Sequence, residues 1–92
     1  MIDVDRLRSC LDDPRKAEPW LKSLRVANLP AAHANLTRMA DHGVTLDLLS
    51  QISEQFAAAA PKLADPDMAL NNLERYLLAA RSPLAAAALF ER

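Results

Sequence analysis

Acidic residues spaced two apart are the first feature of the chain that could do chemistry. Asp3-Val4-Asp5 and Asp65-Pro66-Asp67 both spell D-x-D, a pattern in which paired carboxylates can hold Mg²⁺ against phosphate oxygens. Both pairs stand where a helical pattern begins. A helix N-terminus favours acidic groups because its first backbone amides lack partners. We therefore interpret both pairs as helix caps rather than as metal ligands.

Histidine, cysteine and serine supply the other reactive groups. His33 and His42 are nine residues apart, a spacing that does not return to one helical face, so a shared metal is not expected. Ser9, Cys10 and His33 could form a nucleophile and base, but nothing positions them together. The single cysteine excludes an internal disulfide and a Cys-based metal cluster, and it fits a reducing cytosol. We predict no catalytic, cofactor-binding or metal site in these 92 residues.

Trp20 is a candidate for contact with another protein. It is the single tryptophan and stands between Lys16 and Lys22, so it could be a hot spot at a partner surface. The other interpretation, which is the more common fate of a tryptophan, is that it belongs to the core. The formal net charge is −1, so the sequence carries no electrostatic footprint for nucleic acid or anionic lipid.

The helix expected over about 66–80 offers a second set of candidates. Its apolar stripe leaves positions 71, 74, 75 and 78 largely outward, so Asn71, Glu74 and Arg75 are predicted to form part of a partner surface. Asn72 is expected at the boundary of the stripe. There its amide would bond a neighbouring helix and lock one hairpin to the next, or alternatively hold a ligand.

The composition of the chain, together with its prolines and helix-capping residues, predicts the elements that position these side chains. Hydrophobic residues make up 51% of the chain but aromatics only 4%, and alanine dominates, which favours closely packed helices over a sheet. Prolines that precede apolar periodicity, together with capping residues, mark the helix starts. We predict an all-α fold of five to six short helices packed as a compact, repeat-like bundle of helical hairpins, over about 3–12, 14–26 (with a break at Pro19 as an alternative), 30–41, 46–60, 66–80 and 82 onward.

The buried face of each helix follows from the spacing of its apolar residues. Gly43 is expected to end the third helix, because it tolerates a positive φ, and Thr45 to cap the fourth. No run approaches the roughly 20 apolar residues of a membrane span, so no membrane segment is predicted. The predicted core consists of Val4, Leu7, Leu11, Trp20, Leu21, Leu24, Ala32, Leu36, Met39, Ala40, Leu46, Leu49, Ile52, Phe56, Ala59, Ala69, Leu70, Leu73, Tyr76, Leu77 and Ala80.

A short repeat recurs at an offset of 37 residues. Residues 32–38 (AHANLTR) align with residues 69–75 (ALNNLER), and Ala, Asn, Leu and Arg are identical at matching positions. The same offset places the capping residue Thr45 on Ser82. Each copy would be a helical hairpin of the size found in repeat arrays, about 34–47 residues. Chance matches between Ala- and Leu-rich helices are the alternative explanation.

Several segments of the chain share a pattern with one protein family. The segments are residues 65–76 (DPDMALNNLERY), 82–84 (SPL), 89–92 (LFER) and, less specifically, 32–36 (AHANL) with 43–44 (GV). Together they resemble the start of the bacterial glutamine synthetase adenylyltransferase family, ahead of its first catalytic domain. Because the last helix ends at residue 92 without a cap, we expect a segment from the N-terminus of a larger polypeptide.

The resemblance implies a large cytoplasmic enzyme with two nucleotidyltransferase domains. One domain attaches AMP to a tyrosine of glutamine synthetase and the other removes it by phosphorolysis, under control of glutamine and a PII-type signalling protein. ATP and Mg²⁺ are the implied cofactors of the whole enzyme. Catalysis in that family needs a Gly-Ser turn, whereas here the one glycine, Gly43, precedes Val44.

Two interpretations of function therefore stand. The first is a non-catalytic N-terminal helical segment of such an enzyme, with no family active-site residue to carry over. The second is a free-standing helical protein–protein interaction module without enzymatic activity. The coding sequence beyond residue 92 separates them, because only the first predicts a continuation into a domain with Gly-Ser and D-x-D motifs.

Overall fold

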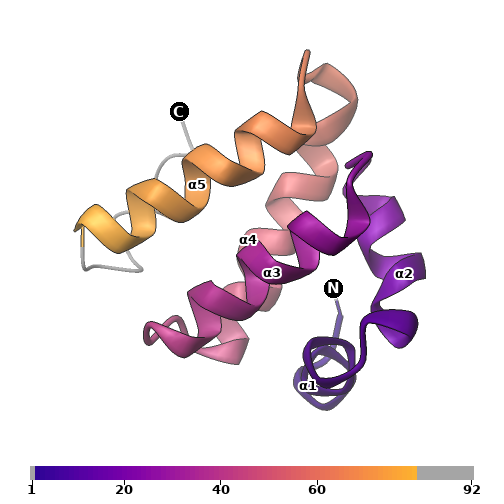
Figure 1. Ribbon diagram of the computed structural model, residues 1–92, viewed down its shortest axis with the longest axis vertical. Coiled ribbons are helices and arrows are strands. Elements are labelled where there is room, and N and C mark those ends of the chain that lie inside the picture. Colours follow the sequence, from indigo (N-terminus) through magenta and orange to yellow (C-terminus); the bar gives the residue numbers. More distant parts are fainter. Residues whose placement is uncertain (1, 81–92) are drawn as a thin grey trace.

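Helices begin where prolines and capping side chains stand in the sequence. The computed structural model describes residues 2–80 and contains five α-helices and no strand in that range, which confirms the all-α prediction (Figure 1). The sixth predicted helix, from residue 82, lies outside the described residues. The elements are α1 (Val4–Asp12), α2 (Pro14–Ser23), α3 (Leu29–Asp41), α4 (Leu46–Ala59), the 3₁₀ helix η1 (Ala60–Lys62) and α5 (Pro66–Ala80).

Every α-helix starts with a side-chain cap on its first turn. The capping oxygen accepts a hydrogen bond from a backbone amide that has no partner inside the helix. Gly43 follows α3 with φ +102°, the left-handed conformation predicted for it. The caps are Asp3 on the amide of Arg6, Asp13 on Arg15, Asn28 on Ala31, Thr45 on Leu48 and Asp65 on Met68, at 2.8 to 3.2 Å.

Helix α2 departs from the prediction in two ways. It runs through Pro19 without a break, and it ends at Ser23 rather than near residue 26. Pro19 is in the second turn, where its missing N–H removes a single hydrogen bond to the helix. Arg25 then takes a left-handed φ of +60°, which ends the helix, while Leu24 and Val26 on either side remain buried.

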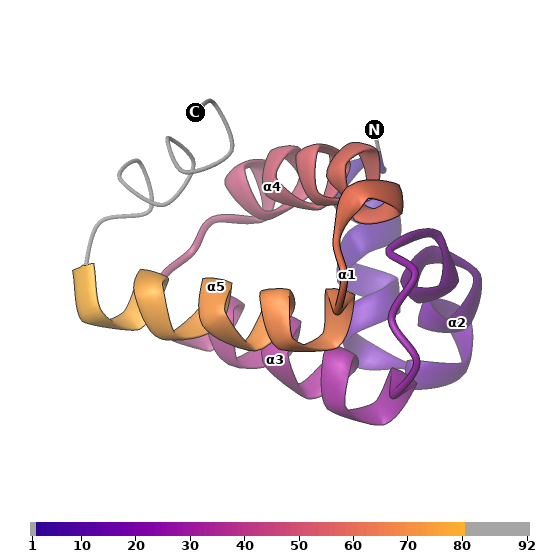
Figure 2. The same ribbon diagram turned by 90° about the horizontal axis from the view of Figure 1, so that it is seen from above.

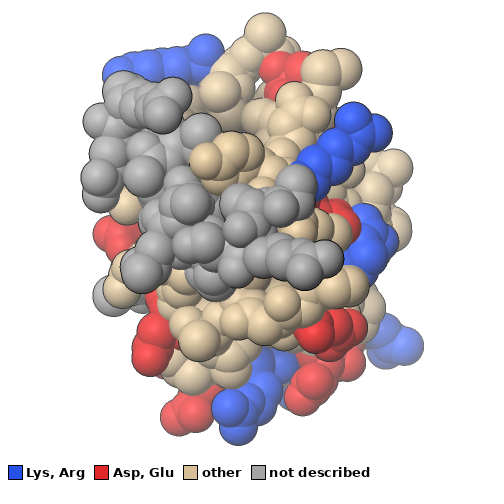
Figure 3. Space-filling view, turned by 90° about the vertical axis from the view of Figure 1, so that its left-hand side faces the viewer, with Lys and Arg blue, Asp and Glu red and all other residues tan. Residues whose placement is uncertain are grey.

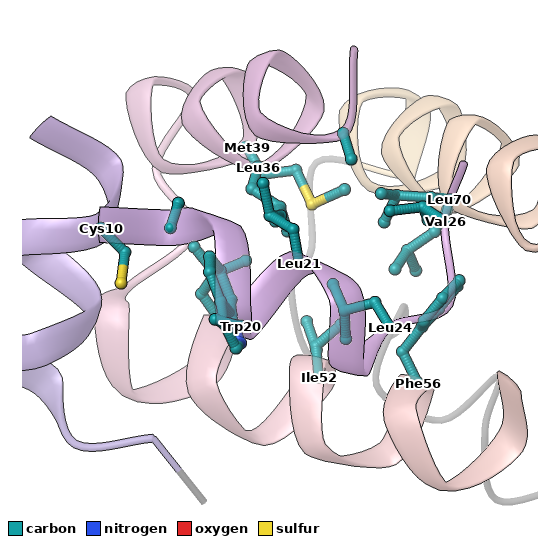
Figure 4. Close-up of a cluster of buried hydrophobic side chains, with 14 of the residues drawn as sticks. Cys10, Trp20, Leu21, Leu24, Val26, Leu36, Met39, Ile52, Phe56 and Leu70 are labelled. Atoms are coloured by element: carbon teal, nitrogen blue, oxygen red, sulfur yellow. The ribbon is translucent and has the colours of Figure 1, made fainter. Parts of the chain in front are cut away.

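The core lies among α1, α2, α3 and α4, and α5 adds to it from outside along α3 (Figures 1 and 2). Figure 4 shows the side chains of this cluster converging from several helices. Cys10 belongs to it although it was not predicted, and Tyr76, which was predicted to be buried, is 38% exposed. The buried apolar residues are Leu7, Cys10, Ala17, Trp20, Leu21, Leu24, Val26, Ala32, Leu36, Met39, Val44, Leu49, Ile52, Phe56, Ala60, Leu70, Leu73 and Leu77.

Helices α3 and α5 lie side by side and run in the same direction (Figures 1 and 2). The hydrogen-bonded pairs show the same direction. Asn35 bonds Asn71 and Arg38 bonds Glu74, so a step of three residues along α3 matches a step of three residues along α5. In the sequence α4 lies between these two helices and returns the chain to the end of the bundle at which α3 began (Figure 1). This is the arrangement of equivalent helices in successive hairpins of a repeat array. No helix in the described part of the chain is long and apolar enough to cross a membrane.

Candidate functional site

A polar junction joins α3 to α5 and is made of Asn35, Arg38, Asn71 and Glu74. The amide nitrogen of Asn35 donates to Oδ1 of Asn71 at 2.7 Å. Arg38 donates twice to the Glu74 carboxylate, from Nε at 2.7 Å and from Nη2 at 2.8 Å. The same Nη2 also reaches the side-chain oxygen of Asn35 at 3.3 Å, so the four side chains form one connected network.

The helical spacing of these residues explains how the junction forms. Asn35 and Arg38 are three residues apart on α3, and Asn71 and Glu74 are three apart on α5, so each pair shares one helix face. When two such helices pack in parallel, the amides meet each other and the charged groups meet one turn later. The junction therefore fixes the register of α5 along α3 as well as holding the two helices together.

Burial makes this network more than a surface ion pair. Asn35 is 3% exposed and Glu74 is 8% exposed, while the Arg38 side chain is about half exposed at 49%. A two-bond arginine–carboxylate pair is among the stronger and more directional polar contacts in proteins. The hydrogen bonds that Arg38 donates to the Glu74 carboxylate raise the pKa of Arg38 above its usual range.

Asp67 makes a second contact between the start of α5 and the rest of the bundle. Its two carboxylate oxygens accept hydrogen bonds from the backbone amides of Ala27 and Asn28, at 2.7 and 2.8 Å. These amides belong to the loop between α2 and α3, forty and thirty-nine residues away in the chain. Asp67 therefore seats the first turn of α5 on the loop that precedes α3.

The structure separates the four residues predicted as a partner surface. Trp20 lies in the core at 9% exposure, as its second interpretation held, and Arg75 is exposed as predicted. Asn71 is exposed but already accepts a hydrogen bond from α3. The outward placement of Glu74 is wrong, because the face of α5 that looked solvent-facing in isolation packs against α3. Asn72, expected at the boundary, is exposed.

Both D-x-D segments serve as helix caps. Asp3 caps α1 and Asp65 caps α5, each by accepting a backbone amide hydrogen bond, while Asp67 holds the α2–α3 loop. In the part of the chain that the structure describes, no three His, Cys, Asp or Glu side chains gather in a way that could hold a metal ion.

The remaining reactive side chains are bonded to backbone. Nε2 of His33 lies 3.0 Å from the carbonyl oxygen of Cys10, which joins α3 to α1, and Nδ1 of His42 lies 2.8 Å from the carbonyl of Arg38 at the end of α3. Burial is the main influence on Cys10, and it raises the pKa of the thiol above the usual range. A raised pKa disfavours the thiolate, which is the reactive form of a cysteine.

An apolar groove of about 390 Å³, which was not predicted from the sequence, lies between α2 and the start of α3. The buried Leu21 and two prolines are among the residues that line it. Ligand pockets in proteins have volumes from about 300 Å³ upward. The groove is lined by Pro14, Arg15, Glu18, Leu21, Leu29, Pro30 and His33.

Charged side chains of both signs lie on the described surface (Figure 3). On the face shown in Figure 3, acidic and basic side chains alternate among other residues, and neither sign forms an extended patch on the described part. Within residues 2–80 the ion pairs are Arg38–Glu74 at the junction and the exposed Lys22–Glu18 on α2.

Comparison with protein-family models, with curated proteins and with solved structures finds no match to this chain. The assignment of the α3–α5 junction as the candidate site is therefore based on the geometry of the structure. Their signal in the sequence is an Asn-x-x-Arg pair in the third helix and an Asn-x-x-Glu pair in the fifth, which is visible once the two helices are known to be parallel.

Proposed function

We propose that this chain is a non-catalytic helical scaffold at the N-terminus of a cytoplasmic enzyme resembling glutamine synthetase adenylyltransferase. That enzyme attaches AMP to a tyrosine of glutamine synthetase and removes it, which regulates nitrogen assimilation. ATP and Mg²⁺ act in its catalytic domains, and its protein partners are glutamine synthetase and a PII-type signalling protein. The role of this segment is to stack helices and to present a surface to neighbouring protein.

The contacts made by residues 65–76, the segment that carries the family resemblance, support the scaffold role. Asp65 caps α5, Asp67 binds loop amides, and Asn71 and Glu74 bind α3. Polar groups that would have to face a nucleotide in a catalytic site are here committed to joining helices. This single observation carries the proposal that the segment organises structure and leaves phosphoryl chemistry to other domains.

Reading the gene and assaying its product test this proposal. We expect the reading frame to continue beyond codon 92 into a domain with a Gly-Ser turn and a D-x-D motif. The full product should transfer labelled AMP from ATP to glutamine synthetase in the presence of Mg²⁺, whereas residues 1–92 alone should transfer none. A stop codon directly after Arg92, or AMP transfer by the isolated segment, would contradict it.

A free-standing interaction module is the second candidate, and the apolar groove between α2 and α3 favours it. A groove lined by Leu21 and Leu29 together with charged residues such as Arg15 suits an apolar side chain of a protein partner. This candidate requires the reading frame to end near codon 92, so the same gene sequence decides between the two.

A further inference from the structure

Helices α3 and α5 behave as successive copies of one unit at the offset of 37 residues. Their caps already correspond: Asn28 accepts from the amide of Ala31, and Asp65 accepts from the amide of Met68, each pair exactly 37 positions from the other. The structural correspondence at the helix starts is independent of the identities in the sequence. It agrees with the offset of the repeat in the sequence.

The faces of α3 and α5 that meet the α-helix two places earlier in the chain also correspond. On α3, His33 bonds the carbonyl of Cys10 in α1 and Thr37 lies one turn further on the same side. The positions 37 residues later are Leu70 and Glu74, and these are the residues with which α5 packs against α3. On each helix the same side therefore faces the α-helix two places earlier in the chain, which is α1 for α3 and α3 for α5.

The opposite face of α3 receives α5, whereas within the described residues 2–80 no helix is paired with the corresponding face of α5. Asn35 and Arg38 receive α5, and their counterparts 37 residues later are Asn72 and Arg75. Both counterparts are exposed, and neither makes a side-chain hydrogen bond or ion pair with the described residues 2–80. Met68 and Tyr76 lie on the same side of the helix, since residues three and four apart share a face.

Exposed apolar area concentrates on this side of α5. Met68 is 58% exposed and Tyr76 is 38% exposed, and among the described residues these are the large hydrophobic side chains that remain exposed. Such side chains beside unpaired polar groups are typical of an interaction surface. We call Met68, Asn72, Arg75 and Tyr76 the outer face of α5.

We propose that the outer face of α5 binds a further helix, parallel to α5, that presents a side-chain amide and a glutamate three residues apart. The amide would pair with Asn72 and the glutamate with Arg75, as Asn71 and Glu74 of α5 pair with α3. The positive charge of Arg75 selects an acidic partner by complementarity. The inference names the partner chemistry of the proposed scaffold and so rests on that function.

A second copy of the chain cannot supply this partner through the same pair. Its own Asn71 already bonds Asn35, and its Glu74 is 8% exposed beneath Arg38. The occupant we propose is therefore a different helix, one that follows α5 in the longer polypeptide of the proposed function.

A peptide with the α5 sequence is the appropriate probe, because α5 is the helix that the α3 face is seen to accept. We would synthesise residues 65–80 with a fluorophore and a hydrocarbon staple replacing Met68 and Asn72, which keeps the peptide helical and disables its own outer face. Binding to the 92-residue chain is followed by fluorescence anisotropy. We expect saturable binding that Arg75→Glu weakens by about fivefold or more.

Matched controls separate this contact from general charge attraction. Arg8 on α1 is exposed and is outside the proposed surface, so Arg8→Glu changes the net charge equally and should leave the affinity unchanged. A peptide carrying Glu74→Arg should bind the Arg75→Glu chain better than it binds the wild type. Both chain variants alter exposed positions, so circular dichroism should show them folded.

Three outcomes would overturn the inference. The first is no binding at millimolar peptide, and the second is equal weakening by the Arg75 and Arg8 variants. The third is a concentration-dependent dimer in sedimentation that Arg75→Glu abolishes, which would assign the outer face to a second copy. None of these bears on AMP transfer by the full gene product, so the scaffold proposal and this one can fail separately.

Discussion

The core among α1 to α4 and the junction between α3 and α5 hold helices together by different means. In the core, large apolar side chains such as Leu21, Leu36 and Phe56 are buried almost completely, and contact is non-directional. At the junction, four polar side chains meet in one register. Burial in the core therefore holds the helices together, whereas the hydrogen bonds of the junction determine the register of α5 along α3.

The largest expected effect is a cavity in the core. Leu36 is 1% exposed, so Leu36→Ala should lower the free energy of unfolding by about 2–5 kcal/mol, through lost burial and an unfilled cavity. Urea denaturation followed by circular dichroism measures the change. Met68→Ala, at a 58% exposed position, is the matched control and should stay within about 0.5 kcal/mol of the wild type. Equal effects at both positions would show that the core is assigned wrongly.

Removal of the buried carboxylate of Glu74 should have the second-largest effect on the free energy of unfolding. Glu74→Ala removes both bonds to Arg38, and we expect a loss of about 1–2 kcal/mol, because hydrogen bonds between charged groups exceed neutral ones. The local effect distinguishes junction from core. Amide hydrogen exchange should accelerate in α5 and change little in α1 and α2, whereas uniform acceleration would mean that α5 is not held separately.

Loss of the α5 cap should have a smaller effect. Asp65→Ala should cost about 1 kcal/mol, since one backbone amide at the helix start loses its partner. Thermal or urea unfolding gives the value. Isothermal titration of the wild type with Mg²⁺ is the accompanying measurement. We expect no heat of binding, and a stoichiometric Mg²⁺ site lost in Asp65→Ala would replace the cap with a metal ligand.

The smallest effect concerns the pH dependence of Cys10. Burial raises the pKa of the folded thiol, so the folded state holds its proton more tightly than the unfolded state does. This contribution to stability is fully present below the pKa of an unfolded cysteine and is lost as the pH rises through the folded pKa. Alkylation by iodoacetamide should therefore be slower in the native chain than in urea at every pH up to that point. Equal rates would contradict burial.

Local signals in the sequence predicted the helices well. Pro14, Pro66 and the caps at Asp13 and Asp65 set helix starts within a residue, and Gly43 marked the end of α3. These features work because capping depends on neighbours within one turn. The predicted end of α2 was wrong by about three residues. The helix ends because Arg25 takes a left-handed φ, and arginine rarely adopts that conformation, so the residue type did not indicate the turn.

The surface of α5 was harder to predict because it depends on a helix far away in the chain. Glu74 has the residue type and spacing of a solvent-facing position, and only the parallel approach of α3 buries it. Tyr76 has the spacing of a core residue, yet it lies on the side that α3 does not cover. Side-chain periodicity gives the faces of a helix but does not say which neighbour meets each face.

A comparison of two double-mutant cycles tests the role of the junction most directly. Arg38–Glu74 is the buried pair, and Lys22–Glu18, at 2.9 Å with side chains 65% and 52% exposed, is the exposed control within the same chain. Each pair would be replaced singly and doubly by alanine, and the coupling energy taken from urea denaturation. We predict a clearly larger coupling for Arg38–Glu74 than for the exposed pair. Equal coupling would contradict a junction that holds α5 in register on α3.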